Sequence, residues 1–203
     1  MPNKDWRSAQ IWEGDWWDTC QNTYFEQQKQ LIYAEKMGLT RSSTPKTPYN
    51  FNLQGKSILD IGGGPTSLLL KCYNGKGKVI DPLKFPDWVS QRYKTAGIEY
   101  EMKKGEELSL DKFYDIIFIY NVLQHCENPE LIIDNARIVG KEIRIFEWID
   151  TGTNMGHIHN LTEEKLNKWL NGEGKIETLN TINLKGKAFY GIFKGKTFKE
   201  NRI

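Results

Sequence analysis

Short apolar runs and helical patterns alternate along most of the chain. Runs of apolar and β-branched residues predict strands at 57–61, 78–80, 98–102, 114–120 and 143–148. Helical spacing of apolar residues predicts helices at 66–73, 87–95, 129–139 and 162–169, each of which follows a strand. The unbroken apolar run Ile116–Tyr120 is typical of a strand that is buried on both faces of a sheet.

This alternation predicts a mostly parallel sheet with helices on both faces, because a crossover helix joins parallel neighbours. Two closing strands are expected at about 175–184 and 187–193, with only a Lys-Gly turn between them. They should form a hairpin and so add one antiparallel strand at the C-terminal end. The expected fold is therefore a doubly wound α/β fold.

The first forty residues differ from the rest. They carry four of the seven Trp residues, and a helix is expected at 23–37, where Gly38 ends it. Residues 41–55 are rich in Pro, Ser, Thr and Asn, which indicates a linker. We divide the chain into an aromatic-rich helical segment (1–40), a linker (41–55) and an α/β domain (56–203).

Composition describes an ordinary folded chain. Its 203 residues are 38% hydrophobic and 27% charged, which fits one domain. The 28 basic and 26 acidic residues leave a net charge of +2, and this balance argues against a nucleic-acid partner. The locally basic tail, 185–203, is interpreted as a solvated edge.

The cysteines and the N-terminus bear on location. Cys20, Cys72 and Cys126 are widely spaced and form no CxxC motif, which is typical of reduced thiols. The first ten residues lack the apolar run of a signal peptide, and no apolar stretch is long enough to span a bilayer. We expect a cytoplasmic protein with no membrane partner.

The sharpest local signal is a glycine turn. An apolar strand, Ser57–Ile61, runs into Gly62, Gly63 and Gly64, and a helix is expected next. Glycines allow a tight turn and let a ligand approach the backbone closely. In an open α/β sheet, a nucleotide-like ligand binds beyond the carboxyl ends of the strands.

An acidic residue accompanies the turn. Asp81 ends the second strand, 21 residues after Asp60, where a carboxylate can accept hydrogen bonds from a ribose diol. This pattern also suits NAD. Asp60 favours another ligand, because a carboxylate two residues before Gly62 fits the ammonium of a methionine group better than a pyrophosphate.

Four segments together resemble the class I S-adenosylmethionine (SAM) dependent methyltransferases, in the style of their small-molecule branch. The four segments are Asp60–Thr66, Val79–Pro82, Gly105–Leu108 and Tyr114–His125, within a resemblance that spans roughly 56–193. The resemblance implies a Rossmann-like, seven-stranded sheet whose last strand is reversed, which agrees with the predicted hairpin. Thr66 is a departure, since the family often has a third glycine there.

The resemblance also implies roles for residues. Asp60 and the backbone of Gly62, Gly63 and Gly64 would hold the methionine end of SAM. Asp81 would bind the ribose hydroxyls. Glu106 would lie near the adenine amino group, and Asn121 would lie under the methionine carbon chain.

The three histidines are candidates on the acceptor side. His125 follows the fourth strand at the carboxyl edge, where it is either a general base or a structural residue of the loop. His157 and His159 alternate in the segment after the fifth strand, and the resemblance suggests a loop lining the acceptor pocket. The sequence places no third ligand near this pair, so we expect no metal.

The N-terminal aromatic residues allow two interpretations. Trp12 and Trp16 are four residues apart and would share a helix face. With Trp17, Tyr24 and Tyr33 they would form a lid over cofactor and acceptor, or they would dock this segment on the core. Trp16, Trp17 and Tyr24 are accordingly candidate substrate-lining residues.

Absent motifs narrow the acceptor. No Asn-Pro-Pro-Tyr or Asp-Pro-Pro-Tyr follows the fourth strand, and no Pro-Cys nucleophile is present there. We therefore expect methyl transfer to an oxygen, nitrogen or carbon of a small molecule. The alternatives are an RNA methyltransferase, an NAD(P)-dependent oxidoreductase, which would need a catalytic pair such as Tyr-x-x-x-Lys, and a non-catalytic SAM-binding partner subunit.

Overall fold

A seven-stranded sheet forms the centre of the protein, which is described here by a computed structural model. The structure describes residues 4–21, 23–42, 50–181 and 184–196. In spatial order, the strands are β5 (Glu99–Met102), β4 (Lys76–Asp81), β2 (Ser57–Ile61), β6 (Tyr114–Tyr120), β7 (Gly140–Ile149), β9 (Lys185–Lys194) and β8 (Lys175–Asn180). The first five are parallel, whereas β9 is antiparallel to both of its neighbours. The predicted sheet and its closing hairpin are confirmed.

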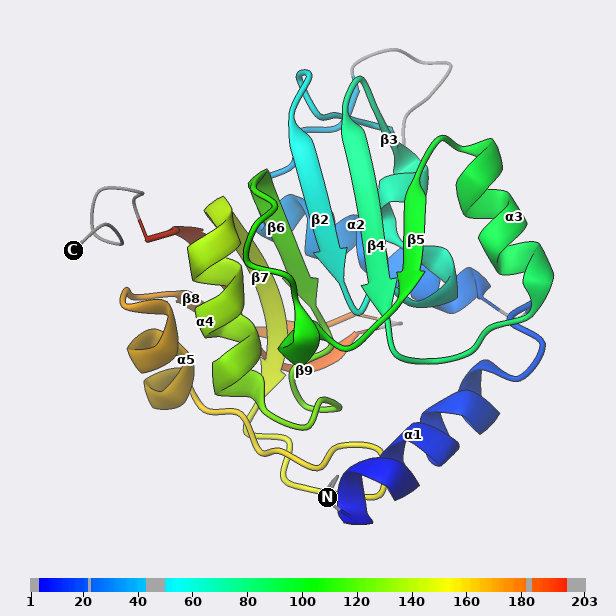
Figure 1. The fold of residues 1–203 in the computed structure, drawn as a ribbon. Coiled ribbons are helices and arrows are strands. Elements are labelled where there is room, and N and C mark those ends of the chain that lie inside the picture. The colour runs from blue at the N-terminus through cyan, green and yellow to red at the C-terminus, as the bar shows by residue number, and fades with distance from the viewer. Residues whose placement is uncertain (1–3, 22, 43–49, 182–183, 197–203) are drawn as a thin grey trace.

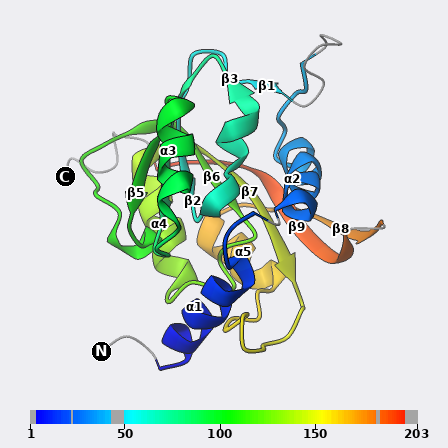
Figure 2. The same cartoon turned by 90° about the vertical axis from the view of Figure 1, so that its right-hand side faces the viewer.

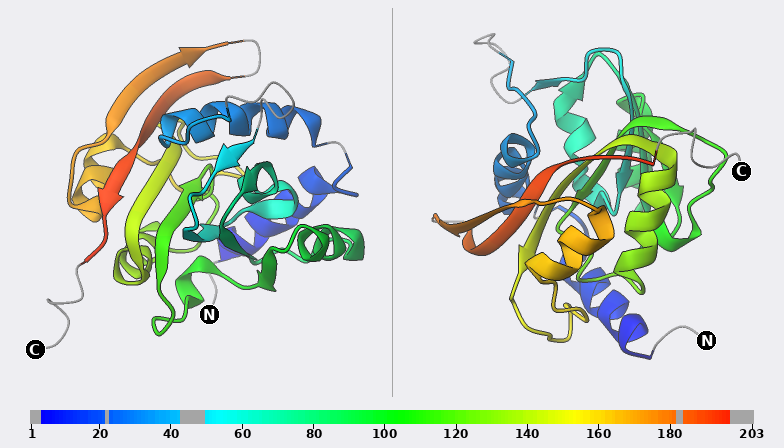
Figure 3. Two further views of the ribbon diagram at one scale, coloured as in Figure 1. Left: turned by 90° about the horizontal axis from the view of Figure 1, so that it is seen from above. Right: turned by 90° about the vertical axis from the view of Figure 1, so that its left-hand side faces the viewer.

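Helices pack on both faces of the sheet (Figures 1 and 3). One face is covered by α2 (Tyr24–Lys36) and α3 (Asp87–Thr95), and the other by α4 (Pro129–Val139) and α5 (Glu163–Leu170). Alternate residues of the central strand β6 serve the two cores, because successive side chains point to opposite faces. Phe118 packs in the core beneath α2, and Ile117 and Ile119 pack in the core beneath α4.

The helix expected at 66–73 is not present. Two short 3₁₀ helices, Gly64–Thr66 and Leu68–Lys71, stand there, and β3 (Cys72–Tyr73) follows and pairs with β1 (Phe51–Asn52). Ser67 separates the two turns with an extended backbone, and its side chain accepts a hydrogen bond from Leu69 N–H. Apolar spacing in so short a segment does not distinguish an α-helix from two tighter turns.

Strand ends and the last turn also differ from expectation. β7 begins at Gly140 rather than at 143, because its first residues pair with β6 and β9. The hairpin reverses between Asn180 and Lys185, where Thr181 N–H donates to the Leu184 carbonyl. The expected Lys-Gly turn therefore lies inside β9, where Gly186 pairs with Leu179.

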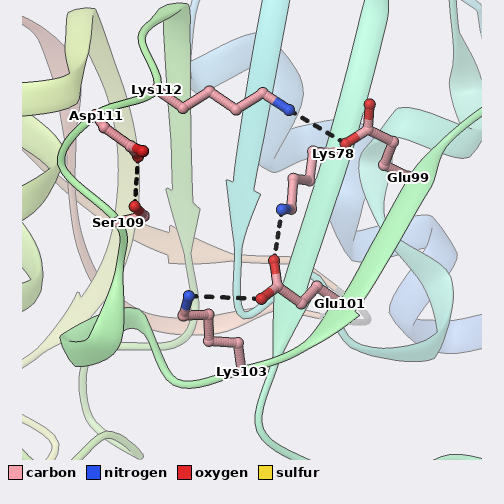
Figure 4. A network of polar contacts seen from close by, with 7 residues as sticks. All are labelled: Lys78, Glu99, Glu101, Lys103, Ser109, Asp111 and Lys112. Carbon is pink, nitrogen blue, oxygen red and sulfur yellow. Dashed lines mark hydrogen bonds and ion pairs between the residues drawn. The ribbon is translucent and has the colours of Figure 1, made fainter.

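One part of the sheet carries ion pairs instead of a helix (Figure 4). The connection from β5 to β6 contains only a 3₁₀ turn, η3 (Gly105–Glu107), within its described residues. On β4 and β5, Lys78 and Lys103 both pair with Glu101, and Lys112 pairs with Glu99. Such solvated pairs contribute about 0–1 kcal/mol each, so this area is a surface rather than a core.

The N-terminal helix α1 (Lys4–Trp17) lies beyond the carboxyl ends of the parallel strands (Figures 1 and 2). No helix in the described ranges is long and apolar enough to cross a membrane. The position of α1 next to the sheet edge brings the N-terminal segment to the end of the fold where the glycine turn lies.

Candidate functional site

The glycine turn begins where β2 ends. Gly62 and Gly64 have φ values of +70° and +58°, which favour glycine. A Cβ on Gly62 would lie 2.1 Å from Cγ2 of Val122, in the loop after β6. The turn therefore combines a left-handed backbone with close approach to the neighbouring loop, and both require glycine.

Two buried tyrosines hold the turn in place. The Tyr93 hydroxyl from α3 accepts a hydrogen bond from Ser67 N–H at 2.9 Å and donates to the Gly64 carbonyl. The Tyr120 hydroxyl from β6 accepts from Leu68 N–H at 2.9 Å. Because both rings are packed in the core, the turn is fixed by rigid elements rather than by the loop itself.

Asp60 lies under the turn and is fully buried. Its Oδ2 accepts hydrogen bonds from Ser67 Oγ at 2.5 Å and from the Tyr120 hydroxyl at 2.7 Å, whereas Oδ1 has no partner. Burial raises the pKa of this carboxyl to about 7, against the effect of the two hydrogen bonds. In this arrangement Asp60 supports the turn from inside.

Asp81 stands at the end of β4 next to the turn. Its Oδ2 accepts a hydrogen bond from Gly64 N–H and its Oδ1 accepts one from Leu83 N–H, both at 3.0 Å. The pKa of this carboxyl is raised to about 7, first by burial and then by the negative charge of Glu13. The structure thus brings Asp81 and the glycine turn together, as the sequence suggested.

A cavity lies between the turn, Asp81 and helix α1. Trp6, Gln10 and Glu13 of α1 form one wall. The other lining residues come from the carboxyl edge of the sheet: Ile61, Gly62, Asp81, Pro82, Lys104, Gly105, Glu106, Val122, His125, Cys126 and Ile132. The cavity measures about 30 Å³, enough for about two water molecules. Helix α1 therefore occupies much of the space that a nucleotide-sized ligand needs.

Glu106 lies in the same cavity and also organises the loop before α4. Its Oε1 accepts hydrogen bonds from Glu127 N–H and Asn128 N–H, both at 2.8 Å. Lys104 Nζ contacts Glu127 Oε2 at 3.0 Å and lies 3.9 Å from the Trp6 ring centroid. This cation–π contact ties the start of α1 to the cavity wall.

The loop after β6 is held from two sides. Asn121 has a φ of +53°, and its Oδ1 accepts a hydrogen bond from Gln124 Nε2. Glu147 of β7 is fully buried, and its Oε1 accepts from Val122 N–H and Leu123 N–H at 3.0 and 3.1 Å. Burial raises the pKa of Glu147 to about 8. Glu147 thereby fixes the position of this loop relative to the strand ends.

The three histidines gather beside that loop. His125 Nδ1 lies 2.7 Å from the Gly156 carbonyl and therefore donates to it, which leaves Nε2 as the acceptor in the neutral ring. The His125 and His157 rings meet edge to face at 4.8 Å, and His159 Nε2 contacts the Cys126 carbonyl. Burial lowers the pKa of His125 and of His157 to about 4, so both are neutral at pH 7.

Aromatic residues of the N-terminal segment have different environments. The Trp12 ring covers Gly156, where a Cβ would lie 2.5 Å from it, and Trp16 stacks on Trp12 with 60% exposure. The Trp17 ring lies over Gly64, 3.5 Å from a Cβ built there. Tyr24 is 65% exposed and lines none of the described cavities, and Tyr33 is buried against Phe146 in the core.

Two further hollows are present. One of about 390 Å³ lies between α1 and the loop after β7, lined by Ser8, Thr153, Asn154, Met155 and Ile158, none of which is charged. Another of about 420 Å³ lies at the amino end of β6, near Lys56 and Arg144. Of these two hollows, only the first is close to the glycine-turn end of the fold, because helix α1 and the loop that contains Gly156 border it.

Sequence reasoning missed several residues of this site. Trp6, Gln10 and Glu13 were not predicted, although together with Trp17, which was, they follow a 4-3-4 spacing that places them on one face of a helix. The sequence shows this spacing, but it does not show which part of the protein this face of the helix contacts. Glu147, Tyr93 and Tyr120 carried no motif, because their roles depend on contacts between distant elements.

No group of three His, Cys, Asp or Glu side chains within the described ranges is arranged to hold a metal ion. No protein-family model matches the sequence, and a search of curated proteins finds no match. Solved structures, by contrast, match over nearly the whole chain.

One match is the 1,6-didemethyltoxoflavin-N1-methyltransferase of Burkholderia thailandensis, with bound 1,6-didemethyltoxoflavin and S-adenosylhomocysteine (SAH). Its TM-score is 0.64 at 12% identity, over 95% of this chain and 88% of that one. The N-methyltransferase NodS of Bradyrhizobium japonicum WM9, in complex with SAH, has a TM-score of 0.61 at 15% identity, over 96% and 100%. The SAM-bound magnesium protoporphyrin IX methyltransferase of Synechocystis PCC 6803 gives 0.56 at 14%, over 84% and 80%. The chain therefore has the Rossmann-like fold of SAM-dependent methyltransferases.

Proposed function

We propose that this protein is a SAM-dependent methyltransferase that acts on an oxygen, nitrogen or carbon atom of a small-molecule acceptor. The fold it shares with methyltransferases that were solved with SAM or SAH supports this function. The observation that carries the proposal is the pairing of Asp81 with the glycine turn, where Gly64 N–H contacts the Asp81 carboxylate at 3.0 Å. A bare glycine backbone beside a carboxylate at the strand ends fits an adenosine-containing ligand.

The residues around the cavity suggest how SAM would be held. Asp81 would accept hydrogen bonds from the ribose hydroxyls, and Glu106 would lie near the adenine amino group. The backbone of Gly62, Gly63 and Gly64 would face the methionine end, with Asn121 below its carbon chain. Asp60 supports this turn from within, so we assign it to the cofactor site through the turn that it fixes.

When bound, SAM supplies an electrophilic methyl group for in-line displacement. The chain's own part is to bind, orient and exclude water. Helix α1 covers the cavity, so it would have to move outward to admit SAM, and its closure over the bound cofactor would exclude water. The Glu147 carboxyl holds Val122 and Leu123 in the loop that the acceptor would approach.

The acceptor would lie between α1 and the loop after β7. The hollow lined by Ser8, Asn154 and Met155 carries no charged side chain, which favours an uncharged acceptor group there. His125 remains the candidate base, and its Nε2 accepts a hydrogen bond from Gln124 Nε2 at 3.3 Å, a contact that an acceptor would have to replace. Its lowered pKa makes it a weak base in this closed arrangement, so orientation of the acceptor by hydrogen bonding is its first role.

The remaining candidates divide between the two sides of α1. Trp17 covers the glycine turn, whereas Trp16 and His157 lie with Trp12 toward the acceptor hollow. We keep His159 and Tyr24 as acceptor-side candidates, although neither lines the cofactor cavity. We also infer a cytoplasmic location, which the three free cysteine thiols support.

The proposal is tested by Asp81→Ala with Asp115→Ala as its matched control. Both side chains accept a backbone N–H, from Gly64 and from Ser57, but Asp115 lies at the opposite end of the sheet. Loss of the ribose contact should weaken SAM binding at least tenfold in Asp81→Ala, from about 1–3 kcal/mol of charge-assisted hydrogen bonding. SAM affinity that falls equally in both variants, or in neither, would remove Asp81 from the cofactor site.

A further inference from the structure

Helix α1 contributes an acidic side chain to the proposed cofactor cavity. The cavity-facing residues Trp6, Gln10 and Glu13 lie on one helix face, while Ser8 and Trp12 face the acceptor side. The Glu13 carboxylate accepts a hydrogen bond from Gln10 Nε2 at 3.3 Å and is hydrogen bonded to Trp17. Its orientation is therefore fixed by its own helix, and it points toward the strand ends.

Acidic groups dominate the charge of this cavity. Glu13, Asp81 and Glu106 line it, and Lys104 is the one basic residue among its described lining residues. Lys104 is already engaged by Glu127 and by the Trp6 ring. The described lining residues therefore carry an excess of acidic groups, which favours a ligand with a positive charge.

Glu13 and Asp81 line the same cavity, and Glu13 acts on Asp81 through its charge. The charge of Glu13 raises the pKa of Asp81, and burial raises the pKa of Glu13 itself to about 7. Two carboxyl groups that line one small cavity are favoured together only when a proton or another positive charge offsets their repulsion. A cationic ligand in the cavity would supply that charge.

SAM and its product differ in this property. The sulfonium of SAM carries a positive charge, and SAH, which has lost the methyl group, does not. A carboxylate near the sulfur attracts SAM and gains nothing electrostatically from SAH. Transfer of the methyl group thus removes the charge that offsets the repulsion between Glu13 and Asp81.

We propose that Glu13 is a specificity-determining residue of the cofactor cavity, through which helix α1 favours charged SAM over neutral SAH. This inference rests on the proposed function, because it concerns the same cavity. Under this proposal α1 also takes part in product release. The Glu13 side chain would hold α1 over the cavity most strongly while the cofactor is charged, and less strongly once SAH has formed.

The test is isothermal titration calorimetry of SAM and SAH against the full chain, Glu13→Gln and Asp15→Asn. Gln keeps the shape and an acceptor for Gln10 and Trp17, and Asp15 is an exposed acid on the same helix with the same charge. We expect SAM affinity to fall about tenfold in Glu13→Gln, and SAH affinity to change less than about threefold. Asp15→Asn should bind both ligands as the wild type does.

Several outcomes would overturn the inference. Equal weakening of SAM and SAH would make Glu13 a general lid contact, and no change for either ligand would remove it from the cavity. An equal loss of SAM affinity in Asp15→Asn would reduce the effect to net charge. A wild type that binds neither ligand refutes the proposed function as well, and so differs from failure of the inference alone. Circular dichroism checks folding, and Glu13→Ala serves as the second variant if Glu13→Gln does not fold.

Discussion

The hydroxyl of Tyr120 donates a hydrogen bond to Oδ2 of Asp60 at 2.7 Å, deep beneath the glycine turn. The same hydroxyl accepts from Leu68 N–H, so one side chain joins β2, β6 and the segment after the turn. Both residues are buried, and water cannot replace either contact. The shape of the turn is therefore set by the side chain of Tyr120, which lies 60 residues after Asp60 in the sequence.

Tyr120→Phe should destabilise the protein by about 1–3 kcal/mol, because it leaves Leu68 N–H without its acceptor and Asp60 with one donor fewer. Urea unfolding followed by Trp fluorescence measures the effect. Tyr73→Phe, at an exposed tyrosine, is the control and should change stability by less than about 0.5 kcal/mol. Equal stability of Tyr120→Phe and wild type would show that the network does not hold the turn.

Gly62→Ala should be far more damaging than Gly97→Ala. Both glycines have a φ of +70°, so alanine pays the same backbone strain of about 1–2 kcal/mol at either position. Only at Gly62 does the new Cβ also meet a neighbour, Val122 Cγ2 at 2.1 Å, whereas nothing lies within 4 Å at Gly97. Thermal unfolding of the two variants separates the clash from the strain. A similar loss of stability in both would mean that the Val122 loop moves aside freely.

Glu147→Gln should change how stability depends on pH. The folded-state pKa of Glu147 is about 8, above its ordinary value of 4.5. Its contribution to stability is thus fully present below pH 4.5 and is lost as the pH rises through 8. Gln can still accept from Val122 N–H but cannot ionise, so it should lose less stability between pH 6.5 and 9.

The pH range from 6.5 to 9 spans the folded-state pKa of Glu147. Asp60, Asp81 and Glu13, whose pKa values are raised to about 7, also titrate in this range, but they are the same in both proteins, so the difference between the two profiles reports Glu147. Melting temperatures at pH 6.5, 7.5, 8.5 and 9 give the comparison, with Glu99→Gln, an exposed acid, as the control. Parallel profiles for wild type and Glu147→Gln would contradict a protonated Glu147.

His125→Ala should reduce turnover by about a hundredfold if His125 accepts a proton or orients the acceptor. SAM affinity should stay within about threefold of wild type, because the binding contacts assigned to SAM lie on the other residues of the cavity. Single-turnover methyl transfer and calorimetry provide the two readouts. His159→Ala serves as the comparison, because His159 contacts the Cys126 carbonyl and does not itself line the cavity. A loss of folded structure in His125→Ala would give His125 a purely structural role.

The sequence predicted the parts of the fold that depend on local pattern. Helices at 87–95 and 129–139 have the bounds that were expected, because Pro86 and Asn128 precede them and strong amphipathic spacing fills them. The prediction of a helix at 66–73 was wrong, because tyrosine hydroxyls from α3 and β6 accept hydrogen bonds from Ser67 N–H and Leu68 N–H. No pattern within eight residues contains that information.

The residues of the candidate site also divide into those that a local pattern predicts and those that depend on contacts between distant elements. Asp81 and the glycines carry a spacing that can be read from one strand and one turn, and the structure places them together. The sequence predicted the N-terminal Trp residues as a lid or as a docked segment, but it could not predict that α1 docks on the sheet edge through Trp17 on Gly64 and Trp12 on Gly156. Glu147 was missed for a related reason, since a carboxyl within an apolar strand has meaning only beside the loop it supports.

The central claim is that the cavity between α1 and the glycine turn binds SAM. Calorimetric titration of the wild-type protein with SAM, SAH and NADH in separate runs tests it most directly, with Trp fluorescence in the same samples to report movement of α1. We predict binding of SAM and SAH with a change in fluorescence, and no response to NADH. Absence of SAM binding, or clear binding of NADH, would contradict the account and make the glycine turn a dinucleotide site.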